Sequence, residues 1–197
     1  MTIETSVGQK QRRPRGRPRR FTIDVVVSKV KACFAQRGYA GTSISDLEEA
    51  TGLSSPSLYN SFGDKRTMFL QCLDSEYEDL SSRLNGLNLE DPLPTRLSRF
   101  LGTVVDGYPM NRPNPGIAFG AALSEVTSDP EVQQRLRRFD LALDSAARSV
   151  LGDGERTISA SLLSAVAIGL CVRSQSSASS SAEIDVRKLA CLLASEV

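Results

Sequence analysis

Small hydroxyl and amide side chains, together with one tyrosine, crowd a single short segment of this 197-residue chain, residues 42–65, which reads TSISDLEEATGLSSPSLYNSFGDK. Leu58 and Phe62 are four residues apart, so on a helix they face inward together. The residues left on or near the outward side are Ser55, Ser57, Tyr59, Asn60 and Ser61. Such groups can hydrogen-bond to nucleic-acid bases and phosphates. A plain solvated helix face is the alternative for any one serine, but the spacing of the whole segment favours binding.

Two short helices must position these side chains. The hydroxyl of Ser43 can cap a helix that covers residues 44–51, and Asp46 completes a capping box with it. Gly52 stands where the chain must turn sharply, because glycine adopts a positive φ at low cost. Ser54 or Ser55 offers the next cap, and the proline that follows sets φ for a first helical turn. Helices joined this closely are typical of a helix-turn-helix, which points to DNA.

Residues 25–73 resemble the amino-terminal domain of the TetR family of bacterial transcriptional regulators. In this comparison the first helix covers residues 25–43, and SLYNSFGDK at residues 57–65 is the most specific motif. A helix from Asp64 is similar to the family helix that links the DNA-reading head to the body. One departure is Glu48, where the family often has a small alanine.

The resemblance implies specific roles in DNA binding. The recognition helix falls on residues 55–61, and its serines and Asn60 are the candidates for base edges. Tyr59 and Lys65 resemble family residues that reach phosphates, the lysine aided by the positive end of its helix. The implied DNA contacts from the folded head are Ser43, Ser45, Ser55, Ser57, Tyr59, Asn60, Ser61 and Lys65.

A basic arm precedes this domain. Residues 10–20, KQRRPRGRPRR, hold seven basic side chains among eleven. The RGRP core resembles an AT-hook, in which arginines such as Arg15, Arg17 and Arg19 lie along a narrow minor groove of A·T-rich DNA. The alternative is a flexible tail that binds phosphates without preference. Either form should raise the affinity for DNA and its salt sensitivity.

Charge and composition separate the two ends of the chain and exclude several functions. Residues 1–65 hold eleven Lys or Arg against six Asp or Glu, whereas residues 66–197 hold thirteen against seventeen. The chain has no histidine, so it lacks imidazole for a catalytic pair or a metal site. Walker, GxGxxG and CxxC motifs are missing too. We therefore expect no enzyme, no catalytic or metal site and no cofactor.

No stretch approaches the ~20 apolar residues that a membrane-spanning helix needs, and the start of the chain has no apolar signal region. The four cysteines show no paired spacing. The sequence thus predicts a cytoplasmic protein with reduced thiols and no membrane partner.

The fold class predicted is all-α, with about nine helices. We expect a basic disordered arm at residues 1–21, a three-helix helix-turn-helix domain at 22–66, and a helical effector-binding and dimerisation domain at 67–197. Breaks at proline and glycine place the helices of this last domain at residues 64–84, 95–107, 116–126, 129–151, 155–173 and 182–195.

In the TetR family the last two long helices form a four-helix dimer interface, which implies a homodimer here. The candidate interface residues are Leu162, Leu163, Val166, Leu170, Leu189, Leu192 and Leu193. Apolar spacing alone fits an intramolecular core equally well.

Residues 113–136 are similar to a TetR subgroup that includes the ComR and AcuR regulators. Members often carry a cysteine where this chain has Ile117, so a small organic effector is favoured over a metal- or thiol-sensing role. The candidate pocket residues are Phe100, Val104, Tyr108, Phe119, Leu123, Phe139 and Leu143, which fit a plain core as well. Arg112, Arg173 and Tyr108 are the polar candidates for an acidic ligand.

Together these features predict a ligand-responsive repressor. It would bind a palindromic double-stranded operator as a dimer and leave it when the effector pivots the connecting helix. The alternative is an architectural protein that coats A·T-rich DNA mainly through its arm.

Overall fold

The computed structural model describes residues 23–106, 129–152, 158–176 and 186–195. Every element in these ranges is a helix, which confirms the all-α prediction. The elements are α1 (Ile23–Gly41), α2 (Ile44–Thr51), α3 (Ser55–Phe62), α4 (Lys65–Asn85), α5 (Leu93–Asp106), α7 (Pro130–Leu151), α8 (Ala160–Ser176) and α9 (Val186–Ser195). The predicted arm at 1–21 and the predicted helix at 116–126 lie outside the described residues.

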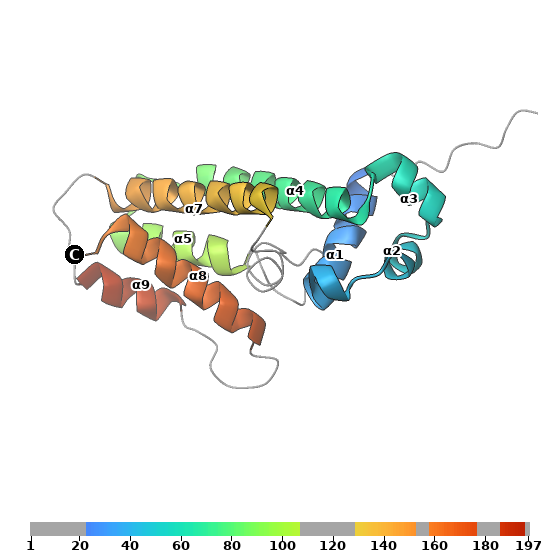
Figure 1. Ribbon diagram of the computed structural model, residues 1–197. Coiled ribbons are helices and arrows are strands. Elements are labelled where there is room, and N and C mark those ends of the chain that lie inside the picture. Colours follow the sequence, from blue (N-terminus) through green and yellow to red (C-terminus); the bar gives the residue numbers. More distant parts are fainter. Residues whose placement is uncertain (1–22, 107–128, 153–157, 177–185, 196–197) are drawn as a thin grey trace, which may run out of the picture.

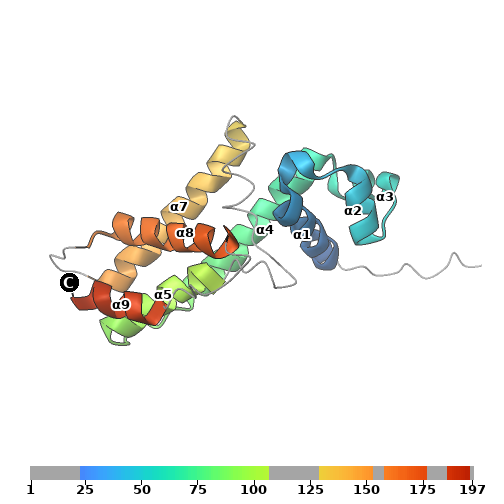
Figure 2. The ribbon, with the colours of Figure 1, turned by 90° about the horizontal axis from the view of Figure 1, so that it is seen from below.

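The molecule has a small head and a larger body, joined by one long helix (Figure 1). Helices α1, α2 and α3 form the head. Helix α4 packs against α1 at one end and against α7 and α5 further along. Seen from below, α9 lies beside α5 and α8 crosses α7 (Figure 2), while α5 contacts both α7 and α8. The boundary predicted between residues 66 and 67 therefore falls within α4, a continuous helix.

Buried apolar side chains from both parts form one core. In the head, Phe34 of α1 meets Phe69 of α4 edge to face, with ring centroids 5.2 Å apart. Leu47 of α2 and Leu58 of α3 are fully buried beside them. Burying a side chain of this size stabilises a fold by about 1.5–3 kcal/mol, so the head is anchored on α4.

The starts of α5 and α8 differ from the sequence prediction. Helix α8 begins at Ala160 rather than near residue 155, because the hydroxyl and carbonyl of Ser159 accept the N–H groups of Leu162 and Leu163. Helix α5 begins at Leu93, before the predicted start, because the carbonyl of Pro92 accepts the first N–H groups of this helix. In both cases the residue that caps the helix sets its start, and apolar periodicity does not reveal that residue.

None of the helices in the described ranges combines the length and the apolar character needed to cross a membrane.

Candidate DNA-binding interface

The predicted capping box at the start of α2 is confirmed. The Ser43 hydroxyl accepts the N–H of Asp46 at 3.2 Å, and Asp46 Oδ2 accepts the N–H of Ser43 at 2.8 Å. The bonds from Ser43 lower the pKa of the Asp46 carboxyl, and Arg37 of α1 adds an ion pair to it. The first turn of α2 is therefore fixed to α1 as well as capped.

The turn between α2 and α3 is also as predicted. Gly52 has φ 74°, and its N–H donates to the carbonyl of Glu48 at 2.8 Å. Residues with a Cβ rarely adopt this left-handed conformation. The backbone thus leaves α2 sharply and enters α3 within three residues.

The start of α3 is capped by a residue of α2. Ser54 is the N-cap by position, but its side chain makes no capping hydrogen bond. Instead the Glu48 carboxylate accepts the backbone N–H of Ser55. This bond from Ser55 lowers the pKa of Glu48, and the carboxylate lies at the positive end of the α3 dipole. The sequence comparison marked Glu48 only as a departure from the family, and the structure shows that it joins α2 to α3.

Four of the five predicted contact residues of α3 are exposed, and Ser55 is half-buried. Leu58 and Phe62 are buried beneath the helix, as predicted. Tyr59 is 47 % exposed, and the hydroxyls of Ser54 and Ser57 lie 3.0 Å apart at the surface. Ser57, Asn60 and Ser61 are exposed on α3, Ser43 and Ser45 are exposed at the start of α2, and Ser55 is half-buried. Arg15, Arg17 and Arg19 lie outside the described residues.

The positive end of α4 lies next to this face. Asp64 caps the helix by accepting the N–H of Thr67 at 2.7 Å. The Lys65 ammonium sits 4.5 Å from the centre of the Tyr39 ring, a cation–π contact that limits where this charge can go. Tyr39 itself packs on Phe34 and Phe69. Lys65 is therefore a cation held at a helix N-terminus, an arrangement suited to binding a phosphate.

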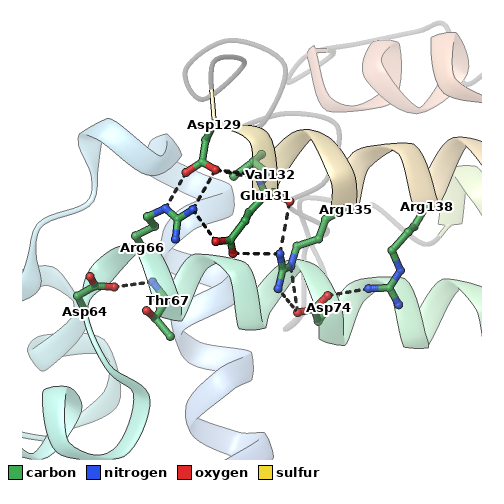
Figure 3. A network of polar contacts seen from close by, with 9 residues as sticks. All are labelled: Asp64, Arg66, Thr67, Asp74, Asp129, Glu131, Val132, Arg135 and Arg138. Carbon is green, nitrogen blue, oxygen red and sulfur yellow. Dashed lines mark hydrogen bonds and ion pairs between the residues drawn. The ribbon is translucent and has the colours of Figure 1, made fainter.

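An ion-pair network ties the same end of α4 to α7 (Figure 3). Arg66 donates two bonds to Asp129, from Nε to Oδ2 at 2.7 Å and from Nη2 to Oδ1 at 3.0 Å. Its Nη2 also lies 3.3 Å from Glu131. Asp129 accepts the N–H groups of Glu131 and Val132, so this one carboxylate caps α7 and holds α4. The bond from Arg66 lowers the pKa of Asp129 to about 2.

The network continues along the two helices. Arg135 of α7 lies 3.6 Å from Glu131 and donates to Asp74 of α4 at 3.0 Å. Arg138, one turn further along α7, donates to the other oxygen of Asp74 at 3.0 Å. Asp74 is 61 residues from Arg135 and 64 residues from Arg138, so no local pattern indicated these two bonds between helices.

The predicted pocket residues that the structure describes are core residues. Phe100 and Val104 of α5 and Phe139 and Leu143 of α7 are wholly buried, and none of them lines a described cavity. The helical spacing that suggested a cavity wall is the same spacing that packs α5 against α7. Tyr108, Phe119, Leu123 and Arg112 lie outside the described residues, as does the side chain of Arg173.

The predicted dimer residues differ in exposure. Leu163 is wholly buried within its own chain. Its neighbour Leu162 is 52 % exposed, and Leu192 of α9 is also largely exposed. The remaining candidates, Val166, Leu170, Leu189 and Leu193, are half-buried against the core. On α8, therefore, Leu163 points into the core and its neighbour Leu162 points outward.

Residues 29–72 match the family of bacterial regulatory proteins called the tetR family. The transcriptional repressors ComR and BdcR of Escherichia coli (strain K12) are 41 % identical over 72 residues and 38 % identical over 68 residues. The first match covers 36 % of this chain and the second 34 %, and each spans about a third (34 %) of the repressor. YezE, an uncharacterized HTH-type transcriptional regulator of Bacillus subtilis (strain 168), is 36 % identical over 133 residues, which are 66 % of this chain and 69 % of YezE.

Two solved structures share the fold. A cysteine mutant of the TetR-family regulator CifR, complexed with 26-bp operator DNA, has a TM-score of 0.63 at 22 % identity, over 92 % of this chain and 97 % of CifR. The regulator FadR of Bacillus subtilis in complex with stearoyl-CoA has a TM-score of 0.56 at 13 % identity, over 85 % of this chain and 93 % of FadR. With YezE related over most of its length and the helix-turn-helix in place, this chain belongs to the TetR family of bacterial regulatory proteins.

Proposed function

We propose that this protein is a transcriptional repressor that binds a palindromic DNA operator as a homodimer and leaves it when a small organic effector binds. The observation that carries the proposal is the geometry of α3. Its polar face is exposed at the end of the molecule, its first turn is held by Glu48, and Lys65 with the N-terminus of α4 lies beside it. This pairing of α2 with α3, and the nearby Lys65 ammonium, support the insertion of α3 into the major groove of DNA.

The related proteins support the same function. ComR and BdcR are repressors, and their similarity covers 36 % and 34 % of this chain. The CifR structure holds operator DNA in a protein of the same fold. The side chains of α3 are short, with no arginine for bidentate contacts to guanine, so part of the sequence preference is assigned to the arm at residues 1–21.

A two-fold dimer is the arrangement that presents two heads to a palindrome. Helix α8 offers a surface for it, because Leu162, Ala165 and Gly169 are exposed at helical spacing. A Cβ added to Gly169 would meet nothing within 4 Å, so the backbone of a partner helix can approach closely there.

For an effector bound in the body to release DNA, the position of the head must change when the body changes. The ion pairs from Arg66 to Asp129 and Glu131 join the first turn of α4 to the first turn of α7. An effector that prefers a different arrangement of α4 and α7 lowers the affinity for DNA by at most the factor by which it prefers that state.

Footprinting on the DNA beside the protein's own gene tests the proposal. We expect protection of a discrete palindrome at moderate salt, retained in a variant that lacks residues 1–20 but with lower affinity. Broad protection that vanishes with those residues would instead indicate the architectural, arm-driven function. The matched head variant is Tyr59→Phe, which should weaken protection without changing its boundaries.

A further inference from the structure

A groove runs along the outer side of the body, between the second half of α4 and α7. Its volume is about 510 Å³, within the range of small-molecule sites. The loop after α4 closes one end with Leu87 and Leu89, and Leu141 of α7, which is 70 % exposed, stands on the rim. The rest of the lining is mixed: leucine, alanine and valine side chains alternate with polar groups such as Asn85 and Ser145.

Arg138 is the only charged side chain among the described residues that line this groove. Its guanidinium lies 4.2 Å from the centre of the Tyr77 ring, and Tyr77 meets Phe139 edge to face at 5.5 Å. The bond to Asp74 uses Nη1 of Arg138. A guanidinium carries five N–H donors in a fixed plane, so a second carboxylate can share it or compete for it.

A groove that offers leucine and alanine side chains, serine hydroxyls and one held cation matches one class of ligand. We propose that this groove binds a small molecule with an apolar chain and a single carboxylate, with the carboxylate on Arg138 and the chain along α4 and α7 toward Leu87. A neutral ligand would leave the cation unused, and a cationic ligand would be repelled by it. This inference rests on the proposed function, for which it names the effector's chemical class and its site.

The site is connected to the head by contacts already described. Arg138 shares Asp74 with Arg135, Arg135 pairs with Glu131, and Glu131 pairs with Arg66 at the start of α4. Figure 3 shows these side chains in one continuous row. A ligand carboxylate on Arg138 competes with Asp74 and so changes the ion pairs that hold α7 against α4. Binding in the groove and operator binding are then linked, in both directions.

Calorimetric titration with decanoate, below its micelle concentration, tests the site on the full chain. Decanol is the uncharged control ligand. Arg138→Gln should weaken decanoate binding about three- to tenfold, the range for one partly exposed ion pair. The matched control is Arg137→Gln, because Arg137 is an exposed neighbour on α7 that does not line the groove. Equal decanoate affinity in the two variants, or decanol binding as tightly as decanoate, would overturn the proposal.

A second variant leaves the ion pairs intact. Ser145→Trp fills the groove from an exposed position, whereas Gln134→Trp places the same ring on α7 away from it. We expect decanoate binding to be lost in Ser145→Trp and kept in Gln134→Trp. Absence of decanoate binding in the unaltered protein contradicts the site outright.

Operator binding is measured by fluorescence anisotropy with and without decanoate. A weaker operator affinity with decanoate in the unaltered protein, and no change in Ser145→Trp, is the expected result. If decanoate binds but operator affinity does not change, the proposed coupling between the groove and the head is wrong. Operator binding by the ligand-free protein tests the proposed function separately, since it needs no occupied groove.

Discussion

The carboxylate of Glu48 accepts the backbone N–H of Ser55, so a residue of α2 caps the first turn of α3. The two residues are seven positions apart and lie on opposite sides of the Gly52 turn. The angle between the two helices is therefore held by a charge-assisted hydrogen bond as well as by the buried residues beneath. The Ser54 hydroxyl, which would otherwise cap α3, instead meets the hydroxyl of Ser57 at the surface.

Replacing Glu48 should weaken operator binding. Glu48→Ala leaves the first turn of α3 without this acceptor, whereas Glu48→Gln keeps an oxygen that can accept and should restore most of the affinity. Removing a negative charge near the DNA phosphates would by itself strengthen operator binding. If Glu48→Ala binds the operator more weakly, the cause is therefore a change in the position of α3. The control is Glu49→Ala, which removes the same charge from an exposed neighbour. Fluorescence anisotropy measures the affinities, and equal behaviour of the two alanine variants would contradict the positioning role.

The head shows which parts of the fold local sequence rules can predict. The capping box of Ser43 and Asp46, the positive φ of Gly52 and the buried pair Leu58 and Phe62 each depend on residues within four positions, and all were predicted. The hydrogen bond between Ser55 and Glu48 spans the turn between α2 and α3, so rules based on neighbouring residues do not predict it.

The body shows the opposite case. Apolar spacing identified α8 but not which side of it faces inward, because Leu162 and Leu163 both fit a stripe. The bond between Arg66 and Asp129 joins positions 63 residues apart and depends on how α4 and α7 pack. Such contacts follow from tertiary structure and leave no periodic signal in the sequence.

Lys65 should account for one phosphate contact. Lys65→Gln is expected to reduce operator affinity and to lower the slope of log affinity against log salt by about 0.9, the value for one released counterion. Tyr59→Phe should reduce affinity without altering that slope, because a phenol hydroxyl is neutral. Anisotropy titrations from 50 to 300 mM salt measure both. Arg137→Gln, a body variant of equal charge change, should leave the slope as it is, and an unchanged slope for Lys65→Gln would remove this residue from the interface.

Leu162 and Leu163 should respond to substitution in different ways. Leu162→Glu puts a charge on the exposed face of α8 and should dissociate the proposed homodimer, as measured by sedimentation velocity. Leu163→Ala opens a cavity in the core and should lower the free energy of unfolding by about 2–5 kcal/mol in urea titrations. Leu141→Glu, on the exposed side of α7, is the control for surface charge. If Leu162→Glu sediments as the unaltered protein does, the dimer uses another face.

The pairing of Arg66 with Asp129 should make stability depend on pH in a defined window. The bond from Arg66 lowers the pKa of Asp129 in the folded protein to about 2, from an ordinary value of 3.8. A carboxyl with a lowered pKa contributes stability that is fully present above its unfolded pKa and is lost as pH falls through its folded pKa. The contribution of Asp129 should therefore be complete at pH 6 and should decline between about pH 4 and pH 2.

The variant that isolates this effect is Asp129→Asn, because asparagine caps a helix about as well as aspartate but carries no charge. Urea titrations should find the unaltered protein more stable than Asp129→Asn at pH 6, with the difference shrinking at pH 4 and pH 3. Arg66→Gln should remove most of this difference at pH 6, since the charge on Asp129 then has lost its main partner. A stability difference that stays constant from pH 6 to pH 3, or that persists in full without Arg66, would show that Asp129 acts on α7 alone and does not join it to α4.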